Sequence, residues 1–319
     1  MQRQHFFKLT AACLLAGFTA LASAQTKTTR ILVAFPPGGP VDFVARTLTE
    51  QLSKELGQQV MVENKAGANG AIAADTLLKA PADGQTLWLT SVGAVAINPS
   101  LYPALPYDPV RDLAPVSLVV NNVEMLVVNP NNPVNGPQEF VAAAKQKPTN
   151  MASSGTGSVP HLAMELLADA TKSNLIHVPY KGAAPAITDV IAGHVDGFFG
   201  DIPGLMGHIR SGKLKPVALA STRRHPLFPD VKTFQEIGIN GVDSDNWYAL
   251  FTHKNIPAAD LERINQAVRR TLANEAVRSK LIASGAEPSA SSSAELSTLL
   301  KNDMVKWGRV IRDKKVKAD

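Results

Sequence analysis

The sequence is almost free of cysteine. Cys13 is the only one in 319 residues, and it lies in an N-terminal segment that we expect to be removed. The rest of the chain therefore cannot form a disulfide, a zinc–thiolate site or a cysteine nucleophile. His177, His194 and His208 have no spacing typical of paired metal ligands, and His225 and His253 are interpreted as loop residues. We accordingly expect neither a bound metal nor a cofactor.

Long apolar runs are missing as well. The run from Leu9 to Leu21 is too short to cross a bilayer as a permanent helix, and no later stretch is long and apolar enough. Arg3 and Lys8 lie near its start, and Ala22-Ser23-Ala24 follows it, which is typical of a secretory signal with an A-x-A cleavage site. We therefore expect cleavage after Ala24 and export of the remaining chain.

Charge of one sign is also scarce. Removing residues 1–24 takes away two cations and lowers the formal net charge from +5 to +3. The only basic cluster is the tail Arg312, Lys314, Lys315 and Lys317, which suits a solvated helix end. This balance argues against nucleic acid as a partner.

Two stretches combine an apolar strand, a glycine turn and a helix start. Residues 31–46 read ILVAFPPGGPVDFVAR, and residues 150–165 read NMASSGTGSVPHLAME. The first lacks the Lys-Ser/Thr ending of a nucleotide P-loop, and the second lacks the full G-x-G-x-x-G spacing of a dinucleotide site. A helix start offers free amide groups and a partial positive charge. Two such starts that face each other would clamp a small anion.

Strands and helices alternate along the rest of the chain. Short loops join them, which predicts doubly wound α/β domains that bind ligands at the carboxyl ends of strands. The apolar stretch Val116–Val128 is long for one strand, and Asn121-Asn122 breaks it, so it suits a crossing between two domains. The strand Trp247–Thr252 is interpreted as the return to the first domain.

Six motifs in order make the chain similar to a known family. They are FPPGGPVDFVAR from Phe35, VENKAGANG from Val62, AINPSLY from Ala96, GTGSVPHL from Gly155, HVPYKGAAPA from His177 and PLFPDVKTFQE from Pro226. Together they resemble the TctC or Bug family, the periplasmic solute receptors of tripartite tricarboxylate transporters. The resemblance covers nearly all of the chain after residue 24.

The resemblance implies a fold, a location and a partner. The fold would be of the type II periplasmic-binding-protein kind, with lobe 1 formed by residues 25–121 and 244–319 and lobe 2 by residues 122–243. A small organic carboxylate, or a related amide, would bind in the cleft between them. The receptor would work in the periplasm as a monomer and deliver this ligand to the membrane subunits of a tripartite transporter.

Ten residues in or beside the motifs are candidates for ligand contact. They are Gly38, Gly39, Ser91, Ser154, Thr156, Gly157, Ser158, His161, Lys181 and Asp201. Each has a plainer interpretation: a glycine turn, a loop hydroxyl bonded to its own backbone, a helix cap, or a surface lysine. Asp201 could accept from a ligand amine or hydroxyl. Asp42 is left out, because an acid there would repel a carboxylate unless the ligand carries an amine.

Two alternatives to a transport receptor remain open. A ligand sensor that serves a sensor kinase would have the same fold and site, and the sequence does not separate the two. An exported hydrolase could use Ser154 or Ser158 with His161, although no G-x-S-x-G elbow accompanies them. We expect no catalysis. We also expect Gly157 to lie in an open cleft. A variant protein with valine at this position should therefore fold but bind no ligand.

Overall fold

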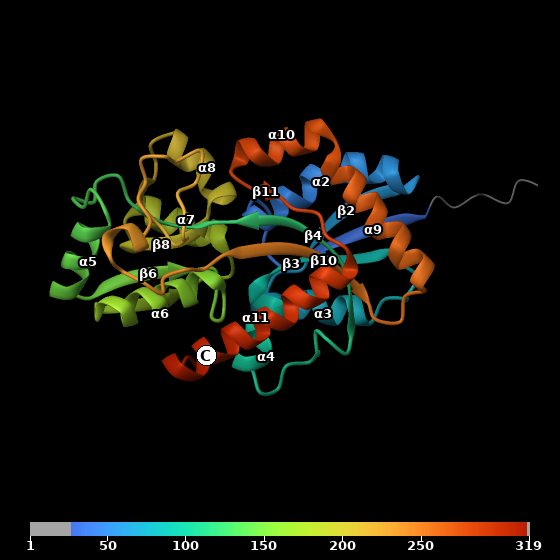
Figure 1. Ribbon diagram of the computed structural model, residues 1–319, viewed down its shortest axis with the longest axis horizontal. Helices are drawn as coiled ribbons and strands as arrows, with labels where there is room; N and C mark the ends of the chain where they lie inside the picture. Colours follow the sequence, from blue (N-terminus) through green and yellow to red (C-terminus); the bar gives the residue numbers. More distant parts are fainter. Residues whose placement is uncertain (1–26, 318–319) are drawn as a thin grey trace, which may run out of the picture.

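The computed structural model describes residues 27–317 and consists of two lobes side by side (Figure 1). The predicted signal segment and its cleavage site lie outside the described residues. Each lobe is built on one sheet. No helix among the described residues is long and apolar enough to cross a membrane.

The sheet of lobe 1 has six strands in the order β11-β4-β10-β3-β1-β2. Its strands are β1 Thr28–Val33, β2 Gln59–Asn64, β3 Thr86–Ser91, β4 Leu113–Asn122, β10 Asn246–His253 and β11 Glu287–Pro288. β1 pairs in parallel with both β2 and β3, whereas β10 runs antiparallel between β3 and β4. The carboxyl ends of β1 and β3 therefore meet at one edge of the sheet.

Helices cover both faces of this sheet because its central strands are apolar on both sides. Ile31 and Val33 pack on one face, and Leu32 between them packs on the other. The first face is covered by α2 Pro40–Leu56, α9 Ala258–Ala273 and α10 Glu275–Ser284. The second is covered by α3 Ala71–Leu78, α4 Asn98–Leu101, α11 Ser293–Lys314 and the short turns η1 Ala68–Gly70 and η2 Gly93–Ile97.

Lobe 2 repeats this layered plan with five strands in the order β7-β6-β8-β5-β9. The strands are β5 Glu124–Val128, β6 Thr149–Ser153, β7 Leu175–Pro179, β8 Gly197–Asp201 and β9 Lys215–Leu219. The helices are α5 Pro137–Gln146 and α6 Val159–Thr171 on one face, α7 Ala183–Ala192 and α8 Ile202–Arg210 on the other, and the short turn η3 Gln235–Ile237. Both sheets are thus doubly wound.

Two crossings join the lobes. The predicted Val116–Val128 stretch is divided between β4 and β5, and only Val123 separates these strands. The chain returns through β10, whose first residue, Asn246, pairs with Asn122 of β4. In Figure 1 β4 and β10 run beside each other where the lobes meet. The end of β4 and the starts of β5 and β10 therefore lie together at the base of the space between the lobes.

Candidate functional site

A cavity that opens to solvent lies between the lobes. Its lining residues come from both lobes: Phe35, Pro36, Gly39, Pro40, Val41, Ser91, Ser154, Ser158, Val159, Pro160, Ala183, Ala184, Phe198, Gly200, Asp201, Asn246 and Tyr248. None of them is a lysine, an arginine or a histidine. An anion in this cavity would have to be bound by amide and hydroxyl groups, not by a side-chain cation.

Four helix starts converge on this cavity. Gly39 caps α2, Ser158 caps α6, and Asp201 precedes α8. Ala183 and Ala184 form the first turn of α7. First-turn amides have no partner within their own helix and carry the positive end of the helix dipole. The sequence predicted two of these starts, those of α2 and α6.

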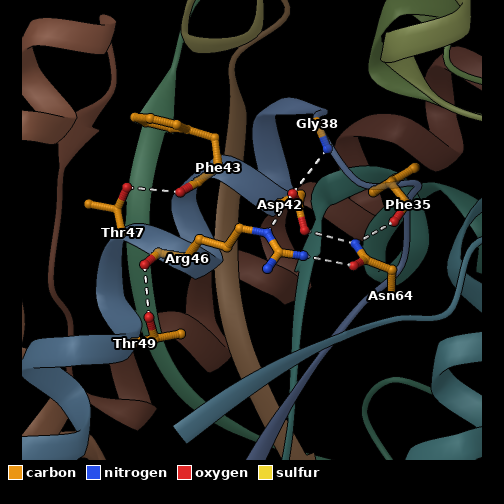
Figure 2. Close-up of polar contacts among 8 residues, drawn as sticks. All are labelled: Phe35, Gly38, Asp42, Phe43, Arg46, Thr47, Thr49 and Asn64. Atoms are coloured by element: carbon orange, nitrogen blue, oxygen red, sulfur yellow. Dashed lines mark hydrogen bonds and ion pairs between the residues drawn. The ribbon is translucent and has the colours of Figure 1, made fainter.

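Asp42 holds the glycine loop before α2 in place (Figure 2). It accepts hydrogen bonds from the Gly38 amide at 3.0 Å, from Arg46 Nε at 2.9 Å and from Asn64 Nδ2 at 2.9 Å. Burial alone would raise the pKa of Asp42, but the hydrogen bonds from Arg46, Gly38 and Asn64 together hold it below the ordinary value. Asp42 is therefore ionised and already neutralised, and it does not line the cavity.

The structure distributes the ten predicted site residues over several places. The five that line the cavity are Gly39, Ser91, Ser154, Ser158 and Asp201. Thr156 and Lys181 lie instead, with Ser154, on a neighbouring hollow. Gly38 faces a shallow groove beside α8 and α10. Gly157 and His161 line neither the cavity nor this hollow. The Ser158 hydroxyl also accepts from the His161 amide at 3.4 Å, so its predicted capping role is confirmed.

The expectation that Gly157 lies in an open cleft is wrong. Its φ is +78°, and a Cβ atom built on it would lie 2.5 Å from Leu101 Cδ2 and 3.5 Å from polar atoms of Asn69 and Asn98. These neighbours belong to lobe 1, whereas Gly157 belongs to lobe 2. The glycine is therefore needed where the lobes are packed together behind the cavity.

His161 is engaged in local structure. Its Nδ1 accepts from the Gly157 amide at 3.2 Å, its Nε2 lies 3.6 Å from Glu165 Oε1, and its ring stacks on His177 at 3.7 Å. Within residues 27–317 no hydrogen bond joins this ring to Ser154 or Ser158. The same residues contain no group of three or more His, Cys, Asp or Glu side chains placed to hold a metal. The geometry thus gives no support to the predicted alternative of a serine hydrolase.

Sequence reasoning missed the polar partners of Asp201. Asn246 Nδ2 donates to Asp201 Oδ1 at 3.0 Å and to Glu124 Oε1 at 3.1 Å, and the Tyr248 hydroxyl donates to Asp201. Burial raises the pKa of Asp201 to about 7, against the lowering effect of these hydrogen bonds. Burial and the neighbouring Asp201 raise the pKa of Glu124 well above its ordinary value. The wall at the base of the cavity is therefore an acid cluster that keeps a proton near neutral pH.

Residues 44–316 match the model of the tripartite tricarboxylate transporter family receptor, TctC. The chain is also 34% identical over 304 residues to the protein BugT of Bordetella pertussis, and the match covers 93% of each chain. The protein belongs to the TctC family. The family assignment and the two-lobed α/β fold predicted from the motifs are thus confirmed.

Solved TctC-type structures superpose closely on this chain. MatC of Rhodopseudomonas palustris, with bound malate, is 31% identical with a TM-score of 0.84, and the match covers 90% of this chain and 99% of MatC. The R. palustris protein Rpa4515, with adipate, is 28% identical with a TM-score of 0.89, and the match covers 93% of this chain and all of Rpa4515. Both ligands are small dicarboxylates. The TctC family is a family of periplasmic solute-binding receptors.

Proposed function

We propose that this protein is a non-catalytic periplasmic receptor that binds a small organic carboxylate, or a related amide, in the cavity between its lobes. It is exported, cleaved after Ala24 and acts as a monomer that delivers its ligand to the membrane subunits of a tripartite transporter. Residues 25–121 and 244–319 form its first lobe, and residues 122–243 its second. The malate and adipate of its relatives support the ligand class.

The observation that carries this proposal is the convergence of helix starts on a cavity with no side-chain cation. Amides at the starts of α2, α6 and α7 face the same space from two lobes. Ser91, Ser154 and Ser158 add hydroxyl donors. The amide groups are fixed by the backbone and the serine side chains are short. Binding an anion therefore does not require the ordering of long side chains, which would cost entropy.

A thermal-shift screen over carboxylates tests the proposal. A ligand at 100 times its dissociation constant stabilises the native state by about 2.7 kcal/mol, which is a visible shift for a chain of this size. Neutral esters of the same acids serve as controls and should not stabilise the protein. A screen without any stabilising carboxylate, or hydrolysis of the esters, would contradict the proposal.

Replacing Lys181 by alanine should weaken binding by less than tenfold, under about 1.4 kcal/mol. Lys181 is exposed and lies on the neighbouring hollow, so an anion at the helix starts does not depend on its charge. Calorimetric titration of the variant with the best carboxylate of the screen measures this directly. A thousandfold loss would make Lys181 the main anion partner and would be incompatible with binding by amides.

A further inference from the structure

The acid cluster at the base of the cavity is built into the junction of the lobes. Glu124 of β5 and Asp201 of β8 are directly opposite each other in an antiparallel pair. Glu124 is fully buried and Asp201 is 7% exposed. Like charges directly opposite on neighbouring strands repel, and burial makes this repulsion stronger. Two carboxyl groups therefore remain here only because they share a proton and the donors of Asn246 and Tyr248.

This wall offers acceptors to a ligand and almost no donors. The Tyr248 hydroxyl hydrogen and the Asn246 amide hydrogens are directed at the carboxyl groups. The buried Oδ1 of Asn246 has no hydrogen-bond partner among the described residues, and Asn246 is 4% exposed and lines the cavity. This oxygen is therefore a further acceptor beside the acid pair.

A second carboxylate is a poor occupant of this end of the cavity. It would bring only acceptors to Asp201 and Asn246, and it would add a negative charge beside the acid pair. An ammonium group has three donors and no acceptor, and its charge is opposite to that of Asp201. Its hydrogen bonds to a carboxylate would be charge-assisted, in a cavity that is also lined by apolar groups such as Phe198 and Ala183.

We propose that Asp201 and Asn246 bind the ammonium group of a zwitterionic ligand, whose carboxylate lies at the starts of α2, α6 and α7. This inference rests on the proposed function and narrows its ligand class. It makes Asp201 and Asn246 the residues that distinguish an amino acid from a plain dicarboxylate. Glu124 does not line the cavity and acts as a positioning residue behind Asp201.

Affinity for such a ligand should depend on pH. The groups that face Asp201 are Glu124 on β5, Tyr248 and Asn246 on β10, and no cation lines the cavity. Since the ammonium group favours the ionised carboxylate, binding should tighten as the pH rises from about 6 to about 8, through the raised pKa of Asp201. A dicarboxylate should show the opposite dependence, because it favours the protonated pair.

Calorimetric titration with paired probes tests the inference. The amino acids β-alanine, 4-aminobutyrate, 5-aminopentanoate and 6-aminohexanoate are compared with malonate, succinate, glutarate and adipate, which have the same numbers of carbon atoms. At neutral pH at least one amino acid should bind tenfold or more tightly than its dicarboxylate partner. Tighter binding of the dicarboxylate in every pair would overturn this inference and leave the proposed function intact. No binding by any of the four amino acids would also overturn this inference, whereas the proposed function is decided by the wider thermal-shift screen.

Two isosteric variants separate recognition from a structural role. Asp201→Asn should remove the preference for the amino acid and its pH dependence. Glu124→Gln should keep or increase the preference at neutral pH, because a glutamine can donate to Asp201 and favour its ionised form. Equal losses in both variants, with unchanged circular dichroism, would mean that the cluster only supports the fold. The comparison of probes on the wild-type protein decides the matter even if Asp201→Asn does not fold.

Discussion

Replacing Gly157 by valine is expected to lower the free energy of unfolding by about 4 kcal/mol. The backbone there has a φ of +78°, which a β-branched residue adopts only under strain. The new side chain would also collide with Leu101, which is only 5% exposed and packed in the core of lobe 1. Chemical denaturation of the purified variant measures the loss, and part of the variant should be degraded before purification.

Gly38 provides the matched control for this prediction. Its φ of +84° is close to that of Gly157, but a Cβ atom there would have no neighbour within 4 Å. Gly38→Val should therefore cost only the backbone strain, about 2 kcal/mol. If the two variants lost equal stability, the packing of Gly157 against lobe 1 would contribute nothing, and our account of this position would be wrong.

Local sequence patterns were sufficient to predict most of the fold. The sequence pattern predicts a helix at Ala258–Ala273, and α9 has those bounds in the structure. The strand predicted at Trp247–Thr252 differs from β10 by one residue at each end. Apolar periodicity is strong in both segments, because each packs one face or both against a core. By contrast, α10 at Glu275–Ser284 was missed, since it buries only Val277 and Leu281 and its polar sequence carries little periodic signal.

The candidate site could be predicted only in part. Glycines and serines in the sequence indicate where a turn occurs, but they do not indicate which part of the protein the turn faces. The sequence identified the starts of α2 and α6, and the structure adds those of α7 and α8. Gly157 was expected in the cleft because its motif surrounds a helix start, yet its bare Cα faces Leu101 of another lobe. Contacts between segments so far apart in the chain leave no mark in either local sequence.

The acid cluster is a second set of contacts that local sequence does not reveal. Glu124, Asp201 and Asn246 lie on three different strands, and only the pairing of β5 with β8 and the return of β10 bring them together. Each residue alone is an ordinary polar residue at a strand end. The family resemblance implies a carboxylate ligand, whereas this long-range cluster provides the chemical argument for a second, cationic group.

The variant Ala184→Asp is expected to weaken carboxylate binding by at least a hundredfold. Ala184 is in the first turn of α7 and lines the cavity, so an aspartate there would face the same amides as the ligand. Two like charges about 5 Å apart repel by about 3 kcal/mol at an effective dielectric constant of about 20. The helix itself should not be destabilised, because an acid in the first turn interacts favourably with the helix dipole.

Ala184→Asn separates this electrostatic effect from steric exclusion. Asparagine has nearly the shape of aspartate without its charge, so it should reduce affinity by less than tenfold, under about 1.4 kcal/mol. Calorimetric titration of both variants with the same carboxylate gives the two affinities, and thermal melts confirm that the proteins are folded. A large loss in both variants would mean that the cavity is merely filled. A large loss of affinity in the aspartate variant alone would mean that the ligand's negative charge lies at the start of α7. The backbone amides would then bind this charge without a side-chain cation.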